Sequence, residues 1–160
     1  MRTFLIATVL LVCSIPLNSL VAGADPAPPA TPPAPPAPAD STALQMFAAV
    51  EAAWSATDAD RLASMVDTTV VRIGLKLGAP PTSAVTRKAA AFLFRDQLRL
   101  VETRAFRILR VEVGSKGTAR AVARWSGDWG GRQGARDVEV VFNAALTGGR
   151  WRLTEVRAND

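Results

Sequence analysis

The residues of this sequence that could do chemistry are carboxylates and an arginine at apolar positions of two predicted strands. Glu155 lies two residues after Leu153, so a regular strand would direct both side chains to one face. Glu102 and Arg104 have the same parity as Phe106. Burial would raise the pKa of such a carboxyl group, as a general base requires, whereas the arginine could keep it ionised or bind an anion. Glu155 and Glu102 are therefore weak catalytic candidates, and structural or solvated roles are the simpler interpretation.

Two tryptophans on one predicted strand could hold a planar ligand. Trp125 and Trp129 share a face, with Gly127 between them, and could stack on a sugar or another planar molecule. Alternatively, Trp125 fills the interior, which we favour, and Trp129 covers its rim. Phe92 and Phe142 are expected to line or close the same interior. The candidate ligand-binding residues are Arg104, Trp125, Trp129, Phe92 and Phe142.

Residue types that dominate catalytic and metal sites are scarce in this chain. Its 160 residues include no His, no Tyr and one Cys, Cys13, which lies in an apolar run near the N-terminus. If that run is removed, Ser-His-Asp and Cys-His nucleophilic sites, thiolate or imidazole zinc sites and disulfides are excluded. We expect no metal and no cofactor, so any chemistry would rest on carboxylates, cationic side chains, hydroxyls and backbone groups.

The N-terminal segment, residues 1–24, has the pattern of a signal peptide. Arg2 supplies a positive charge, an apolar run follows up to Cys13, and small residues precede a cleavage site before Asp25. Polar residues interrupt the run before it reaches the roughly 20 apolar residues of a membrane span. We therefore expect export to the periplasm or the exterior, with no span after cleavage. A retained anchor and a lipidated Cys13 are the minor alternatives, and Val12 is large for the residue before a lipidated Cys.

The next segment, residues 25–40, is a Pro/Ala tract with eight prolines. Proline lacks an amide donor and fixes φ, so the tract favours extended polyproline II. We interpret it as a stiff spacer rather than as a ligand for a proline-binding groove, because it has no flanking Arg or Lys to orient a partner. The remaining residues, 41–160, are sufficient for one domain with a hydrophobic core.

Hydrophobic periodicity separates helices in the first half of this domain from strands that lie mostly in the second, which indicates an α+β fold. Helices are expected to follow caps at Asp40 or Ser41, at Thr57 or Asp58, and at Ser83 or Thr86. Strands are expected over residues 68–77, 102–113, 118–129, 136–146 and 150–158. The apolar phase of the second strand changes near Ile108, which predicts a bulge there.

The positive charge of the chain, +5 in total, is explained by strand surfaces. Arg120 and Arg124 lie on the outward parity of one strand, and Asp137 and Glu139 lie on that of its predicted neighbour. Opposite charges on neighbouring strands pair across the sheet without any ligand. The sequence lacks the run of cations interleaved with aromatics that a nucleic-acid surface needs, so we expect no nucleic-acid partner.

Local sequence patterns resemble those of the NTF2-like superfamily. Residues 53–65 (AWSATDADRLASM) are similar to its helix–helix corner, and residues 149–153 (GRWRL) to its closing strand. The resemblance covers residues 42–158 and implies a cone of about three helices on a curved, mostly antiparallel sheet of about five strands. The run from Phe94 to Phe106 is most similar to small exported bacterial members without an assigned activity. The sheet face of this fold often pairs two chains, which implies a possible homodimer.

The resemblance implies either binding or catalysis. Catalytic members commonly place an Asp, His or Tyr in the cone, and this chain has no His or Tyr. We therefore expect an exported, non-catalytic binding or interaction module whose cone holds a small apolar ligand or is filled. The alternative is a small isomerase- or dehydratase-like enzyme that uses Glu155 or Glu102 as its base.

Overall fold

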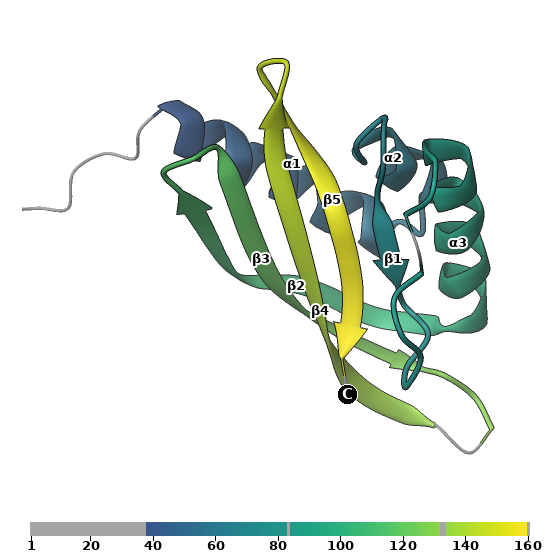
Figure 1. Cartoon of the computed structure of the whole chain (residues 1–160). Coiled ribbons are helices and arrows are strands. Elements are labelled where there is room, and N and C mark those ends of the chain that lie inside the picture. Colours follow the sequence, from purple (N-terminus) through teal and green to yellow (C-terminus); the bar gives the residue numbers. More distant parts are fainter. Residues whose placement is uncertain (1–37, 83, 132–133, 160) are drawn as a thin grey trace, which may run out of the picture. The chain divides into compact units, whose positions relative to one another are not determined.

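The computed structural model describes residues 38–82, 84–131 and 134–159. The predicted signal peptide and most of the predicted spacer lie outside these residues. The elements, in chain order, are α1 (Pro38–Ser55), α2 (Ala59–Ser64), β1 (Arg72–Gly74), α3 (Arg87–Leu100), β2 (Glu102–Gly114), β3 (Thr118–Asp128), β4 (Ala135–Thr147) and β5 (Arg150–Asn159) (Figure 1).

The strands form a single five-stranded sheet in the order β1-β5-β4-β3-β2. Strands β2 to β5 are a meander of antiparallel neighbours, and the short β1 pairs with β5 in parallel. The long strands curve, and the helices pack over one face, which we call the inner face (Figure 1). This arrangement confirms the predicted α+β fold with a curved, mostly antiparallel sheet.

Helix boundaries follow local capping chemistry. The Asp58 side chain accepts a hydrogen bond from the Arg61 amide at 2.9 Å and caps α2, and the Thr86 hydroxyl caps α3. Both caps are among the predicted alternatives. Helix α1 begins at Pro38, earlier than the predicted cap at Asp40 or Ser41. A proline is tolerated in the first turn because the amide that it lacks has no partner within the helix.

The predicted strand over residues 68–77 is wrong for most of its length, because only Arg72–Gly74 forms β1. The chain before β1 is held in a turn by Asp67, which is 8% exposed. Its Oδ1 accepts hydrogen bonds from the Thr69 amide at 2.8 Å and the Thr69 hydroxyl at 2.5 Å. The hydroxyl and amide of Thr69 lower the pKa of the Asp67 carboxyl below its ordinary value, although burial opposes them.

Bulges decide which side chains reach each face. A register shift between Ile108 and Arg110 confirms the bulge predicted near Ile108. Two unexpected shifts also occur, one in β2 between Thr103 and Ala105, and one in β5, where Ala144 pairs with Leu153 but Asn143 pairs with Glu155. Thr154 is therefore an extra residue, and every β5 side chain after it changes face.

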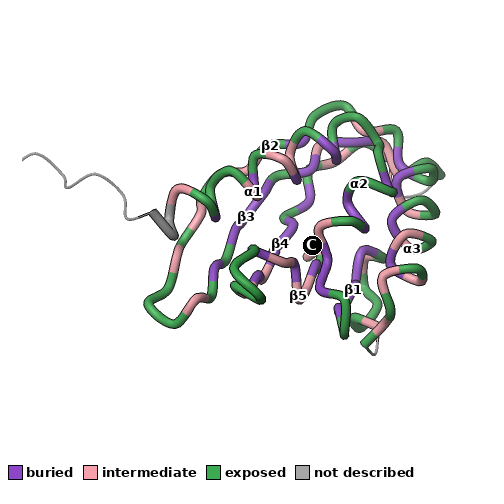
Figure 2. The backbone as a smooth tube through the Cα atoms, turned by 90° about the horizontal axis from the view of Figure 1, so that it is seen from above, coloured by how far each residue is buried: buried purple, intermediate pink, exposed green. Residues whose placement is uncertain are grey.

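The core between the sheet and the helices is a cluster of aromatic rings around Trp54. This ring stacks on Phe106 with centroids 4.6 Å apart, and it meets Phe94, Trp125 and Phe142 edge-on. All five side chains are buried. We call these five rings the aromatic cluster. In Figure 2 the residues of α3 that face the sheet are coloured as buried, and those on its far side are coloured as exposed.

Candidate functional site

The aromatic cluster fills the interior that the sequence predicted as a possible ligand cavity. Five hollows of about 220 to 440 Å³ mark the described part of the protein, and none of the five is lined by a residue of the cluster. Trp125 and Phe142, two predicted ligand-binding residues, are fully buried members of the cluster. They pack against other rings rather than around an opening.

Phe92 differs from its predicted position in the interior. Helix α3 buries Ala90, Phe94 and Leu98, so Phe92 points away from the sheet and is 66% exposed. The Arg95 guanidinium lies 6.0 Å from the centre of its ring. The predicted position of Phe92 is wrong because the residues around it are apolar at nearly every position, so their pattern does not define which side of the helix is buried.

Glu155, the first catalytic candidate, does not share a face with Leu153. The extra residue Thr154 turns Glu155 to the outer face of the sheet, opposite Asn143. There its Oε2 accepts a hydrogen bond from Asn143 Nδ2 at 3.0 Å and forms an ion pair with Arg72 Nη2 at 3.2 Å. The predicted position of this carboxylate inside the cone is therefore wrong.

Glu102 and Arg104 lie at the start of β2, away from Glu155. Both are exposed, and Arg104 Nη2 lies 3.8 Å from Asp128 Oδ2. Asp128 pairs with Glu102, whereas Arg120 lies in the same cross-strand row as Glu155. Arg120 and Asp128 are eight residues apart on β3, which corresponds to about 26 Å. Glu102 and Glu155 therefore lie far apart, and the charged candidates do not form one site.

Trp129 is the one predicted ligand-binding aromatic beside a hollow. Its ring meets Trp125 at an interplanar angle of 61°, with centroids 5.0 Å apart, so the two do not form a flat platform. Trp129 is half-buried just after β3 and lines a hollow of about 340 Å³. Its placement at the edge of the core agrees with the rim interpretation.

A row of polar residues crosses the outer face of all five strands. Cross-strand pairing joins the residues Glu112, Arg120, Asn143, Glu155 and Arg72, in the order β2, β3, β4, β5 and β1. We call these five residues the polar row. Their charges alternate around a central amide: acid, base, amide, acid, base. Neighbouring strands lie about 4.8 Å apart, so the row spans roughly 19 Å.

Internal contacts hold the two ends of the polar row. Glu155 binds both Arg72 and Asn143, and Glu112 Oε1 lies 3.1 Å from Arg110 Nε. The guanidinium of Arg120 differs, because no carboxylate of the described residues lies within ion-pair distance of it. The row therefore presents one cation without an ionic partner next to its centre.

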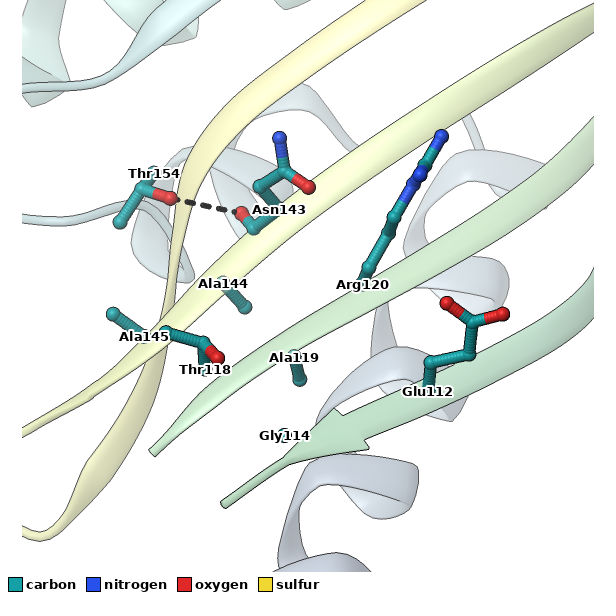
Figure 3. A pocket seen from close by; sticks show the side chains of 9 residues that line it. All are labelled: Glu112, Gly114, Thr118, Ala119, Arg120, Asn143, Ala144, Ala145 and Thr154. Atoms are coloured by element: carbon teal, nitrogen blue, oxygen red, sulfur yellow. Dashed lines mark hydrogen bonds between the residues drawn. The ribbon is translucent and has the colours of Figure 1, made fainter. Parts of the chain in front are cut away.

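A hollow of about 440 Å³ lies beside the polar row (Figure 3). Its wall is formed by Glu112, Arg120 and Asn143, and Thr154 donates a hydrogen bond to the Asn143 carbonyl at 3.2 Å. Small residues also line it, namely Gly114, Thr118, Ala119, Ala144 and Ala145, of which Ala119 and Ala144 belong to the buried core. Long side chains next to small ones give this part of the outer face relief that a partner could match.

The other side of the polar row has an apolar centre. Val122 and Val141 pair across β3 and β4 on the outer face, and they are only 8% and 4% exposed. The predicted charge pairing is present in part. Arg124 Nε lies 4.0 Å from Asp137 Oδ2, whereas Arg120 pairs with Asn143 rather than with a carboxylate.

The described residues contain neither a metal site nor a membrane-spanning helix. No three His, Cys, Asp or Glu side chains among them are grouped as metal ligands. None of the helices in this part of the chain is both long and apolar enough to cross a bilayer.

Solved structures identify the architecture. A DUF4783 family protein from Bacteroides ovatus superposes with a TM-score of 0.59 at 11% identity, over 71% of this chain and 93% of that one. An NTF-2 like protein of unknown function from Shewanella oneidensis gives 0.56 at 14% identity, over 76% and 98%. The fold is NTF2-like. The predicted resemblance is thereby confirmed at the level of fold.

Other comparisons limit the conclusions that this NTF2-like fold supports. A Streptomyces avermitilis protein described as a candidate dehydratase of the NTF2-like family also superposes, with a TM-score of 0.54 at 17% identity over 74% of this chain and 93% of that one. No family model matches the sequence, and no curated protein matches it. At these identities the likeness concerns the fold alone, because one fold can support many functions.

Proposed function

We propose that this NTF2-like domain is an exported, non-catalytic interaction module that forms a homodimer through the outer face of its sheet. The observation that carries the proposal is the polar row. When the row is read backwards, every acid is replaced by a base and every base by an acid, with Asn143 unchanged at the centre. A surface with this property is complementary to itself under a two-fold rotation.

The rotation axis is determined by the row. A two-fold axis between two sheets and parallel to β4 keeps the strand direction and reverses the strand order. In such a dimer β3 faces β5 of the partner and β2 faces β1, so Arg120 would face the partner's Glu155, and Glu112 would face the partner's Arg72. Each pair occurs twice. Arg120, which lacks an ionic partner within the described chain, would gain one.

The inner pair should dominate the electrostatic part of the dimer. Packed sheets cross at roughly 30° because each sheet is twisted, so lateral alignment worsens with distance from the axis. Arg120 and Glu155 lie one strand from β4, whereas Glu112 and Arg72 lie two strands away.

A catalytic role has less support. An enzyme of the predicted kind needs a carboxylate in an enclosed apolar site, where burial raises its pKa. Glu102 is exposed, and Glu155 is bound by Arg72 and Asn143 on the outer face. The likeness to a candidate dehydratase extends to the fold only.

The test is a charge exchange followed by sedimentation equilibrium. R120E and E155R should each raise the dimer dissociation constant by about tenfold or more, because each brings like charges together at two symmetric contacts. The double variant R120E/E155R should recover most of the lost affinity, because the exchanged charges again attract. E112R and R72E, with their double variant, should repeat this behaviour with smaller amplitudes.

A matched control separates the proposed contact from a general effect of charge. Arg61, an exposed arginine on α2, lies off the sheet, and R61E should leave the dissociation constant unchanged. A monomeric wild type, or single variants that dimerise like the wild type, would contradict the proposal. For the export step, N-terminal sequencing of the released protein should begin at Asp25. An intact Met1 or a modified Cys13 would overturn that part.

A further inference from the structure

The hollow beside Trp129 combines an apolar lining with two opposite charges. Its volume of about 340 Å³ lies at the lower end of the range of ligand pockets. The end of α3 and the chain after β1 and β3 supply its walls. Apolar side chains from Leu75, Leu77, Leu100 and Trp129 line it, together with the charged side chains of Lys76 and Asp96. It shares no residue with the polar row.

The Trp129 wall of this hollow is held in place by its neighbours. The Trp125 ring packs against its ring at a centroid distance of 5.0 Å, and the Arg136 guanidinium lies 5.5 Å from its centre. Its amide donates a hydrogen bond to the Gly134 carbonyl at 3.0 Å. A methyl group added at Gly127 would come within 3.4 Å of the Trp129 ring and 2.7 Å of Val101, so only glycine allows this packing. The wall is thus formed before any ligand arrives.

The two charges at the hollow have opposite signs and lack ionic partners. Within the described residues, neither Lys76 nor Asp96 lies within ion-pair distance of an opposite charge. Both are exposed, so they can exchange water for a ligand at little cost. A ligand that complements the whole hollow needs an apolar body, one cationic group and one anionic group.

We propose that this hollow binds a free α-amino acid with an apolar side chain. The side chain would pack against Trp129, Leu77 and Leu100, the α-ammonium would bind Asp96, and the α-carboxylate would bind Lys76. Two opposite charges carried close together on a small apolar molecule distinguish this class from fatty acids, amines and sugars. The site is independent of the proposed dimer.

The test uses isothermal titration calorimetry on the purified protein with three probes of one shape. Leucine carries both charges, 3-methylbutylamine lacks the carboxylate, and 4-methylpentanoate lacks the ammonium. Leucine should bind about tenfold or more tightly than either analogue, because each analogue leaves one charged contact unmade. Glycine, which lacks the apolar side chain, should give no measurable heat.

Variants of the two charges assign the contacts. D96N should weaken leucine and the amine but not the carboxylate probe, and K76M should weaken leucine and the carboxylate probe but not the amine. K88M, at an exposed lysine of α3 that does not line the hollow, is the matched control. Leucine that fails to bind at millimolar concentration, or three probes with equal affinities, would overturn the inference. Either result would leave the charge-exchange test of the dimer unaffected.

Discussion

Alternate residues of β3 and β4 meet two different environments. On the inner face Trp125 and Phe142 belong to the aromatic cluster and are fully buried. On the outer face Arg120 and Asn143 belong to the polar row and border an open hollow. Because strand side chains alternate, a single sheet can use one face for stability and the other for recognition. The aromatic cluster stabilises the interior of this NTF2-like domain, and the charged side chains of the polar row lie on the outer face of the sheet.

Removal of the Trp54 ring from the aromatic cluster should cause the largest loss of stability. W54A should lower the free energy of unfolding by about 3 to 5 kcal/mol, since it removes the ring at the centre of the aromatic cluster. Urea denaturation measures the change. F92A is the matched control on an exposed ring, and it should cost no more than about 0.5 kcal/mol. Equal losses in the two variants would contradict the assignment of the core.

An intermediate effect is expected at Asp67, the buried carboxylate before β1. D67N should lower the free energy of unfolding by about 1 to 3 kcal/mol at neutral pH, because it weakens the hydrogen bonds with Thr69. Because folding lowers the pKa of Asp67, its contribution is present above the unfolded pKa of about 3.9 and is lost as pH falls through the folded value. When thermal unfolding is measured from pH 7 to pH 3, the difference in melting temperature between wild type and D67N should disappear below about pH 4. A constant gap would contradict this role.

A change at Glu139, on the outer face of the sheet, should have a small effect on the dimer. Glu139 lies on β4, so the proposed axis brings it opposite its own copy. E139Q removes this like-charge contact and should lower the dimer dissociation constant by about threefold or less. Sedimentation equilibrium measures the change. If E139Q weakened the dimer, the axis would not run along β4.

The sequence predicted the fold where each element carries a local signal. Turn glycines located β3, β4 and β5, alternation supported β3 and β4, and a change of apolar phase near Ile108 located the bulge in β2. The bulge in β5 left a similar trace, since apolar positions move from Leu153 to Val156, one residue out of step. Interpreted as a phase shift, that change predicts the outward position of Glu155.

The remaining errors concern positions where the sequence pattern is ambiguous. Almost every residue around Phe92 is apolar, so periodicity could not choose the buried face of α3, and packing decided it. The polar row could not be predicted either. It depends on the register of four strand pairs, and one bulge misread in β5 would separate Glu155 from Asn143.

The most direct test of the dimer is a distance measurement between two identical labels. Cys13 is the only cysteine, so C13S provides a background for a single spin label at E139C on β4 or at R107C on β2. Both positions are exposed, and Arg107 lies two strands from β4 on the outer face. Double electron–electron resonance should give a shorter distance between copies for E139C than for R107C. A shorter distance for R107C, or no coupling between copies, would contradict dimerisation through the outer face.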